Sequence, residues 1–169
     1  MSVNAPKSHT AYIGLGSNLE DPIQQLRTAL AELNELTGTR LIRASSLYSS
    51  KPVGPQDQPD FVNAVAQLET AFEPLELLDQ LQALEQAHRR VRERHWGPRT
   101  LDLDLLLFDD TIITHPRLTV PHAHMHERGF VLLPLAEISP KLTLPGKGSI
   151  TDILSNIATD DLQILTKSE

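Results

Sequence analysis

The sequence predicts a single α+β domain, and three observations indicate this fold class. At 169 residues the chain is long enough to bury a hydrophobic core, and because it has no cysteine that core forms without disulfides. Two segments repeat apolar residues at helical spacing, whereas others alternate apolar and polar residues in the manner of strands. No internal repeat or linker divides the chain, so we expect residues 1–8 to be a loose leader and residues 9–169 to form one domain.

The first predicted elements are a strand and a helix. Residues 9–18, HTAYIGLGSN, have the pattern of a short strand that enters a glycine-rich turn. In the helix that follows, Asp21 is a suitable N-cap, Pro22 fits the first helical position and Gly38 ends the element. Between these residues apolar side chains recur every three or four positions, which gives the helix one face to bury.

Two strands and a long loop come next. Residues 39–50 and 61–70 have the composition of strands, and in the second of them Phe61 and Asn63 share a face. The segment 51–60 between them is too rich in proline for regular structure. Loops of this length in a compact domain are usually functional, and a plain surface excursion is the alternative.

The second half of the chain continues with a helix and a strand, followed by smaller elements. A helix runs from Pro74 towards His88, and the apolar strand 101–108 follows an arginine-rich connection. We expect residues 111–117 to pair with that strand after a turn, and a short helix to begin at Ser149. The order strand, helix, strand, strand, helix, strand is that of the ferredoxin-like α+β fold, with a mostly antiparallel sheet and extra C-terminal elements.

The chain is acidic overall but basic in one place. Its net charge of −7 disfavours a protein whose main task is to grip a nucleic-acid backbone. Five of the 15 lysines and arginines are arginines between positions 89 and 99. Guanidinium groups make bidentate contacts with phosphate oxygens, so this cluster suits a small polyphosphate; a solvated helix end is the alternative. No apolar stretch could span a bilayer, so we expect a cytoplasmic protein without a membrane partner. The acidic balance leads us to expect no nucleic-acid partner, and we expect a monomer.

Two acidic residues interrupt the apolar strand. Asp102 and Asp104 would point to one face of the strand, and the odd-numbered leucines from Leu101 to Leu107 to the other. The Cα atoms of the two aspartates would lie about 6.6 Å apart, so their carboxylates would repel each other unless a cation lay between them. Oxygen ligands suit Mg²⁺, which fills its other positions with water and substrate phosphates. The alternative is that both aspartates lie at an exposed edge or pair with nearby arginines.

Three further signals are weaker on their own. The stretch Gly14–Asn18 lacks the Lys-Ser/Thr ending of a P-loop and the third glycine of a dinucleotide fingerprint, which favours a tight turn. The histidines of segment 122–126 lack a matching distant ligand cluster for zinc, and His122, close to Arg128, is better interpreted as a phosphate contact. Trp96 lies in the arginine-rich loop, a setting that favours stacking on a flat ligand over a core role.

Three long motifs together resemble the 6-hydroxymethyl-7,8-dihydropterin pyrophosphokinases of folate biosynthesis. The motifs are PVGPQDQPDFVNAV, HWGPRTLDLDLLLF and RLTVPHAHMHERGFVLLPL, and the likeness extends over nearly the whole chain. The resemblance implies a ferredoxin-like fold and transfer of the β,γ-pyrophosphoryl group of ATP to the hydroxymethyl group of a reduced pterin, with release of AMP. It also implies two Mg²⁺ ions as cofactors, with ATP and the pterin as substrates.

The same resemblance implies roles for individual positions. Asp102 and Asp104 would hold the metal ions, and Arg90 and Arg92 would complete the catalytic group. The residues that would surround ATP are Gln82, Glu85, Arg90, Arg92, Trp96, Arg99, Leu105, Arg117, Thr119, His122 and Arg128. The residues that would surround the pterin are Ser50, Pro52, Val53, Phe61, Asn63, Trp96, Asp102 and Phe130, with the rings of Phe61 and Phe130 on its two sides.

Some positions depart from forms that are common in that family. Ser50 stands where threonine is common, Phe61 where tyrosine is frequent, and Ala123 where some members carry an aromatic residue. The segment from Arg90 to Trp96 is one residue shorter than in some members. These changes bear on loop dynamics and nucleotide affinity more than on the reaction.

Two other classes of protein are alternatives to this interpretation. A metal-dependent phosphohydrolase would use the same aspartates to activate water, and it would release ADP and phosphate without needing a pterin. A non-catalytic RNA-binding module of similar fold would need exposed aromatic side chains on its sheet and a basic face. The aromatic content of 4% and the acidic balance count against that module.

Overall fold

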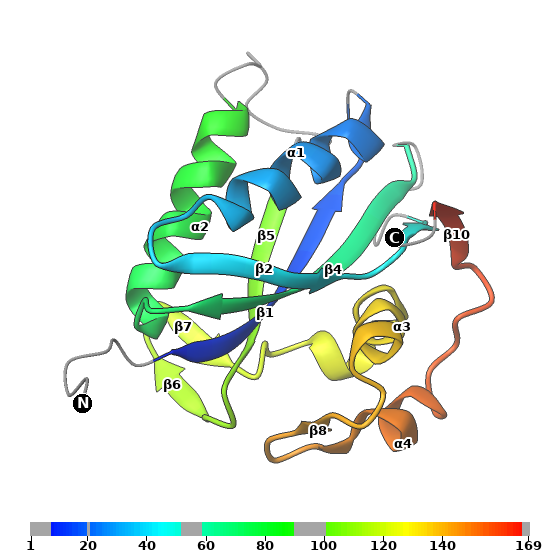
Figure 1. Cartoon of the computed structure of the whole chain (residues 1–169). Helices are drawn as coiled ribbons and strands as arrows, with labels where there is room; N and C mark the ends of the chain where they lie inside the picture. Colours follow the sequence, from blue (N-terminus) through cyan, green and yellow to red (C-terminus); the bar gives the residue numbers. More distant parts are fainter. Residues whose placement is uncertain (1–7, 20, 52–58, 90–100, 167–169) are drawn as a thin grey trace.

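The structure, a computed structural model, describes residues 8–19, 21–51, 59–89 and 101–166. Among these residues the centre is a six-stranded antiparallel sheet in which β10, β3, β4, β1 and β5 lie side by side in that order, and β2 also pairs with β4 (Figure 1). The strands are β1 (His9–Ser17), β2 (Thr39–Ala44), β3 (Leu47–Ser50), β4 (Phe61–Thr70), β5 (Asp102–Phe108) and β10 (Gln163–Thr166).

Helices cover both faces of this sheet. Figure 1 shows α1 (Pro22–Asn34) and α2 (Pro74–Arg89) on one face, and α3 (Gly129–Ile138) on the other. The smaller elements are η1 (Met125–Glu127), α4 (Ile150–Leu154) and the hairpins β6 (Ile113–His115) with β7 (Leu118–Val120) and β8 (Thr143–Leu144) with β9 (Gly148–Ser149). Within the described part of the chain, no helix is both long and apolar enough to cross a membrane.

The predicted order of elements is confirmed. The start of α1 follows the capping expectation, because the side chain of Asp21 accepts a hydrogen bond from the backbone N–H of Gln24. At α4, Ser149 is the N-cap and its hydroxyl accepts from the N–H of Asp152. Both β4 and α2 occupy the segments predicted for them. The expected leader lies almost wholly outside the described residues, since residues 1–7 are not described.

One predicted strand is two strands. Residues 39–50 break at Ser45 and Ser46, which separate β2 from β3. The reason is local: the hydroxyl of Ser45 accepts a hydrogen bond from the backbone N–H of Val65 at 2.9 Å, so a side chain takes the place of a main-chain acceptor in the ladder.

The predicted partner of the aspartate strand is wrong. Residues 113–115 form β6, which pairs with β7, whereas β5 pairs with β1. Two features keep β6 away. Asp109 adopts a positive φ of 50° and turns the chain, and the outer edge of β5 is occupied where Leu103 N–H donates to the carboxylate of Glu85 at 2.8 Å.

The sheet has a separate hydrophobic core on each face. On β5, Leu103 and Leu105 pack against α1 and α2 as expected, and Leu106 packs towards α3. Leu107 also belongs to the α3 side, contrary to the strict alternation predicted for it. The cause is a register shift between Tyr12 and Ile13 of β1, where β1 pairs with β5, because an irregularity of this kind changes which residues face each side.

Candidate active site

The site is built on a row of residues that crosses three adjacent strands. Asn63 of β4 lies opposite Gly16 of β1, and Gly16 lies opposite Asp102 of β5. The next row on the same face is Val65, Gly14 and Asp104. Directly opposed residues point to the same face of a sheet, so an amide and two carboxylates stand on either side of a strip of glycine.

Gly14 and Gly16 correct the expectation of a glycine-rich turn. Both lie inside β1, with main-chain partners on each side. A Cβ atom at Gly16 would come within 3.4 Å of Asn63 Oδ1 and 3.8 Å of Phe61 Cδ1, which are ordinary contact distances. Glycine therefore leaves room for a ligand above the strand, where any other residue would raise the floor.

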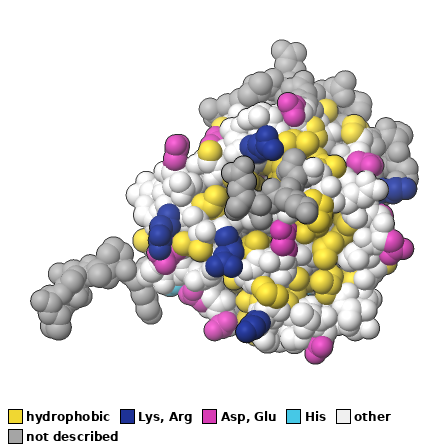
Figure 2. Space-filling model, turned by 45° about the vertical axis from the view of Figure 1, so that its right-hand side comes forward, with side chains coloured by type: hydrophobic (Ala, Val, Ile, Leu, Met, Phe, Trp, Pro, Cys, Tyr) yellow, Lys and Arg dark blue, Asp and Glu magenta, His cyan; other side chains and the backbone are white. Residues whose placement is uncertain are grey.

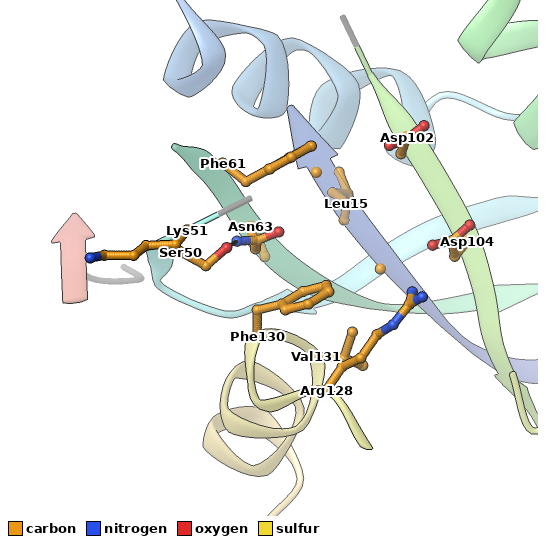
Figure 3. A pocket seen from close by; sticks show the side chains of 13 residues that line it. Leu15, Ser50, Lys51, Phe61, Asn63, Asp102, Asp104, Arg128, Phe130 and Val131 are labelled. Atoms are coloured by element: carbon orange, nitrogen blue, oxygen red, sulfur yellow. Dashed lines mark hydrogen bonds between the residues drawn. The ribbon is translucent and has the colours of Figure 1, made fainter. Parts of the chain in front are cut away.

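This floor belongs to a cavity of about 460 Å³. Figure 3 shows Phe61 and Phe130 on opposite sides of Asn63. Asp102 and Asp104 lie on the strand at the far side of the cavity, and Arg128 points towards Asp104. The guanidinium carbon of Arg128 lies 5.7 Å from the centre of the Phe130 ring. The residues that line the cavity are Gly14, Leu15, Gly16, Ser50, Lys51, Phe61, Asn63, Ala64, Asp102, Asp104, Arg128, Phe130 and Val131.

One wall of the cavity is fixed by a buried hydrogen bond. The side-chain N–H of Asn63 donates to the hydroxyl of Ser50 at 2.6 Å, and both residues are buried. In this orientation Asn63 Oδ1 lies above Gly16 and faces the cavity. The wall can thus offer an acceptor in a fixed direction to a planar ligand that carries N–H groups on its edge.

The opposite wall is a region of negative charge. Burial raises the pKa of Glu85, and the charges of Asp102 and Asp104 add to the effect, while the hydrogen bond from Leu103 N–H opposes it. Burial lowers the pKa of His122. The positive charge of Arg128 lowers this pKa further, whereas the negative charge of Asp104 raises it. A cation placed beside the two aspartates would stabilise all three carboxylates in their ionised form.

The carboxylates fit a metal ion that is shared with a substrate. Asp102 and Asp104 supply hard oxygen donors from one face of β5, which is the chemistry that Mg²⁺ prefers. Across the described residues there is no group of three or more His, Cys, Asp or Glu side chains arranged to hold an ion. Two protein ligands leave most coordination positions to water and to phosphate oxygens, as is usual for Mg²⁺ bound with a nucleotide.

A second group of predicted residues lies between α2 and β7. Arg117 donates to Asp79 Oδ1 at 2.6 Å and to Gln82 Oε1 at 3.2 Å. Thr119 is exposed on β7, and Leu105 is 3% exposed within the cluster that packs against α1 and α2. Gln82 and Arg117 are therefore in contact at the surface, Thr119 is exposed two residues after Arg117, and Leu105 contributes a buried side chain.

Several predicted residues fall outside the described part of the chain. They are Pro52, Val53, Arg90, Arg92, Trp96 and Arg99. Conversely, sequence reasoning did not select Gly14, Gly16 or Lys51 as lining residues. The alternation of the β1 sequence carried the missing signal. Gly14 and Gly16 lie on the same face of the strand as Tyr12, and Ile13 and Leu15 lie on the other face.

Among its described residues, one face of the molecule does not have a single sign of charge. Figure 2 shows hydrophobic side chains together with separate basic and acidic side chains on one face of the molecule. A nucleic-acid binding face would instead gather basic residues into a continuous patch. This mixed surface agrees with the acidic net charge of −7 in disfavouring the RNA-binding alternative.

Comparisons with known proteins agree with these motifs. A family model described as 7,8-dihydro-6-hydroxymethylpterin-pyrophosphokinase (HPPK) matches residues 12–140. A protein of Haemophilus influenzae named 2-amino-4-hydroxy-6-hydroxymethyldihydropteridine pyrophosphokinase is 54% identical over 149 residues, which cover 88% of this chain and 93% of that protein. A protein of the same name from Pseudomonas aeruginosa is 52% identical over 144 residues, covering 85% of this chain and 89% of the other.

A solved structure supports the fold independently. The wild-type HPPK-DHPS of Plasmodium falciparum, crystallised with pterin and p-hydroxybenzoate, superposes with a TM-score of 0.72 at 15% identity. The match covers 98% of this chain and 49% of that chain. At this identity the likeness bears on the fold alone, and it confirms the predicted ferredoxin-like α+β class.

Proposed function

Because the chain belongs to the 7,8-dihydro-6-hydroxymethylpterin-pyrophosphokinase family, we propose that its cavity holds the pterin beside ATP and two Mg²⁺ ions. The enzyme is an ATP-dependent diphosphotransferase of folate biosynthesis. It transfers the pyrophosphoryl group of ATP to 6-hydroxymethyl-7,8-dihydropterin. The observation that carries the assignment of the site is the row Asn63, Gly16, Asp102, which spaces an amide and a carboxylate across a flat floor.

In this proposal the pterin lies between Phe61 and Phe130. Two aromatic rings on opposite sides of a slot can stack on the two faces of the flat bicyclic pterin ring. The glycine floor leaves room for the edge of the pterin to approach the sheet. Asn63 Oδ1 accepts a hydrogen bond from an N–H group on the pyrimidine edge of the pterin. The hydroxyl of Ser50 holds the Asn63 amide in this orientation. The other residues that contact the pterin in this proposal are Pro52, Val53 and Trp96.

The triphosphate then lies on the side of the aspartates. Asp102 and Asp104 hold the two metal ions, which neutralise charge on the phosphate oxygens. Arg90, Arg92, Arg99, Arg128 and His122 add donors around the same oxygens. Gln82, Glu85, Leu105, Arg117 and Thr119 hold the rest of the nucleotide. The enzyme acts as a monomer formed from one domain.

The reaction is an in-line displacement at the β-phosphorus of ATP. The hydroxyl oxygen of the pterin forms a bond to that phosphorus as the bond to the oxygen of the α-phosphate breaks, so AMP leaves and the hydroxyl proton passes to solvent. Such a transfer depends on alignment and charge neutralisation more than on covalent catalysis by the protein. Phe61, Phe130 and Asn63 provide the alignment, and Arg90 and Arg92 stabilise the charge that develops in the transition state.

The test follows nucleotide products by chromatography. The purified protein is mixed with ATP, Mg²⁺ and 6-hydroxymethyl-7,8-dihydropterin, and a parallel sample lacks the pterin. We expect AMP only when the pterin is present, in equal amount to the pyrophosphorylated pterin. ADP, or nucleotide breakdown that does not depend on the pterin, would replace this assignment with a phosphohydrolase.

A further inference from the structure

Glu137 makes a cluster of hydrogen bonds at the far end of the helix that carries Phe130. Its carboxylate accepts from the N–H of Ser46 at 2.9 Å, from the hydroxyl of Ser46 at 2.7 Å and from the hydroxyl of Tyr48 at 2.7 Å. Ser46 is 3% exposed and Tyr48 is 4% exposed, although Glu137 itself lies at the surface. Three donors on one carboxylate form a well-defined attachment between α3 and the segment around the start of β3.

This attachment supports the break between β2 and β3. There the backbone N–H of Ser45 donates to the carbonyl oxygen of Val65 at 2.9 Å, and the side-chain hydroxyl of Ser45 accepts from the N–H of Val65 at 2.9 Å. Ser46 follows this break in the strand, and its N–H donates a hydrogen bond to the carboxylate of Glu137, which lies outside the sheet. The carboxylate therefore holds the chain where it changes direction and so determines the path on which β3 continues.

Two neighbouring contacts fix the same end of α3. Arg43 Nη1 donates to the carbonyl oxygen of Ile138 at 3.1 Å, and the hydroxyls of Tyr12 and Ser139 are hydrogen-bonded at 2.8 Å. The C-terminal end of α3 is thus joined to β1, β2 and the start of β3. The opposite end of the helix carries Phe130 into the cavity.

The spacing along each element connects the attachment to the cavity. Phe130 and Glu137 are seven residues apart, about two helical turns, so they lie on one side of α3. Tyr48 and Ser50 are two residues apart, so they share a face of β3. Ser50 lies opposite Phe61 where β3 pairs with β4. The contact between Glu137 and Tyr48 therefore joins the helix that carries Phe130 to the strand that lies beside Phe61.

We propose that Glu137 is a positioning residue for the pterin, because it sets the width of the slot between the rings of Phe130 and Phe61. This inference rests on the proposed function of the cavity. A flat ring needs both walls within about 3.5–4.0 Å of its faces, and a gap wider by a fraction of an ångström already loses much of the dispersion energy. Glu137 touches neither substrate, so it acts only through the placement of α3 on β3.

The experiment compares two variants of Glu137 with a matched control. Glu137→Ala removes all three acceptor contacts. Glu137→Gln keeps them, because its carbonyl oxygen can accept from Ser46 N–H and Tyr48 while its amide donates to the Ser46 hydroxyl. Glu69→Ala removes another exposed glutamate, one that pairs with Arg40 through Nε at 3.2 Å at a distance from the cavity.

We expect Glu137→Ala to raise the KM for the pterin about tenfold while the KM for ATP changes less than about twofold. Glu137→Gln and Glu69→Ala should stay within about twofold of the wild type for both substrates. Fluorescence titration of the pterin, in the presence of an ATP analogue with a methylene bridge between the α- and β-phosphorus, should show the same ratios in Kd. Equal changes for both substrates, or unchanged constants with only a lower Tm, would overturn the proposal.

Two further outcomes are covered by the design. If Glu137→Ala does not fold, Tyr48→Phe removes one bond of the attachment and should raise the pterin KM about threefold; no change would overturn the proposal. The wild-type enzyme is measured first and separates the two hypotheses. If it binds the pterin without turnover, the proposed function fails and the Kd ratios still decide the role of Glu137. If it binds no pterin, both fail.

Discussion

The two faces of the central sheet are made from the same strands but perform different tasks. On β1, Ala11, Ile13 and Leu15 enter the core beneath α1 and α2, whereas Gly14 and Gly16 line the cavity. On β4 and β5 the same division separates buried apolar residues from Asn63, Asp102 and Asp104. Since alternate residues of a strand face opposite sides, one sequence encodes a face that packs against α1 and α2 and a face that the α3 core and the cavity share.

The difference teaches where stability and activity are located. The face under α1 and α2 is packed mainly with leucine and alanine, so a change there removes buried contacts. The face that bears the site has glycine and partly exposed carboxylates where further apolar side chains would add to the core. We therefore expect substitutions beneath α1 and α2 to lower the free energy of unfolding, and those at the polar and glycine residues that line the cavity to lower turnover.

The largest effect is expected at Asp104. Asp104→Ala should reduce kcat on the order of 10³-fold, because the metal ion loses a ligand at the point where charge develops. Its Tm should not fall, since removing one of the neighbouring carboxylates relieves repulsion. The measurement is steady-state turnover at millimolar Mg²⁺ together with thermal unfolding, with the exposed Asp110→Ala as the control. Turnover near that of the wild type would refute the metal-binding role of Asp104.

The reverse pattern is expected at Leu68, a fully buried residue of β4 on the face covered by α1 and α2. Leu68→Ala should lower the free energy of unfolding by about 2–5 kcal/mol, because it removes buried methyl groups and leaves a cavity. Below its unfolding transition the variant should keep a KM for both substrates close to that of the wild type. Urea unfolding and steady-state kinetics at low temperature test both parts, and a selective rise in one KM would mean that the two faces are coupled.

A smaller effect is expected at Gly16, which sharpens the comparison within β1. A Cβ atom there would meet Asn63 Oδ1 at 3.4 Å without a severe clash, so Gly16→Ala should fold normally. The methyl group would raise the floor of the slot, and the KM for the pterin should increase by about fivefold, with little change for ATP. Kinetics with each substrate varied in turn decide the matter; an unchanged pterin KM would show that the pterin does not lie over this residue.

The smallest effect is a pH dependence at the end of β1 away from the site. His9 is hydrogen-bonded to Asp109 at 2.7 Å and to Glu73 at 2.9 Å. The bond to Asp109 is the main cause that raises the pKa of His9, with Glu73 adding to it and burial opposing it. A raised pKa means that this stabilisation is complete below the unfolded-state value of about 6.5 and is lost as the pH rises through the folded-state value.

The free energy of unfolding of the wild type should therefore fall as the pH rises above about 6.5, by no more than about 1 kcal/mol from this group. The variant His9→Gln cannot carry the charge, so its unfolding energy should change less over the same range. Urea unfolding at several pH values measures the difference. Parallel pH profiles for the two proteins would exclude His9 as the source.

Much of the fold followed from periodicity and capping. Both α1 and α2 have one apolar face and clear ends, and β4 and β5 have recognisable strand patterns. The missed helix is α3, whose residues 130–136 are apolar on all sides and include Pro134, so no period separates helix from strand. The break at Ser45 also escaped prediction, because it depends on a side-chain bond to Val65 on a different strand.

The site residues that could be predicted are those whose side chains are chemically unusual for the surrounding sequence. Asp102 and Asp104 stand out in an apolar strand, and Phe61, Asn63 and Phe130 were identified through the family resemblance. Gly14 and Gly16 were interpreted as a turn because glycine is rare within strands, and only the register with Asn63 and the two aspartates reveals their purpose. Glu137 gives no signal in the sequence, since a lone glutamate in an apolar segment does not indicate what it bonds.

The position of β10 has a consequence for the order in which the sheet is completed during synthesis. β10 pairs with β3, although most of the chain separates them, and Ile164 lies opposite Tyr48. The ribosome therefore completes β1, β4 and β5 well before it releases the strand that covers the outer edge of β3. A nascent chain that stops short of residue 163 leaves that edge open to other strands, next to the wall that carries Ser50. The sheet edge beside Ser50 is therefore the last part of the described sheet to be covered.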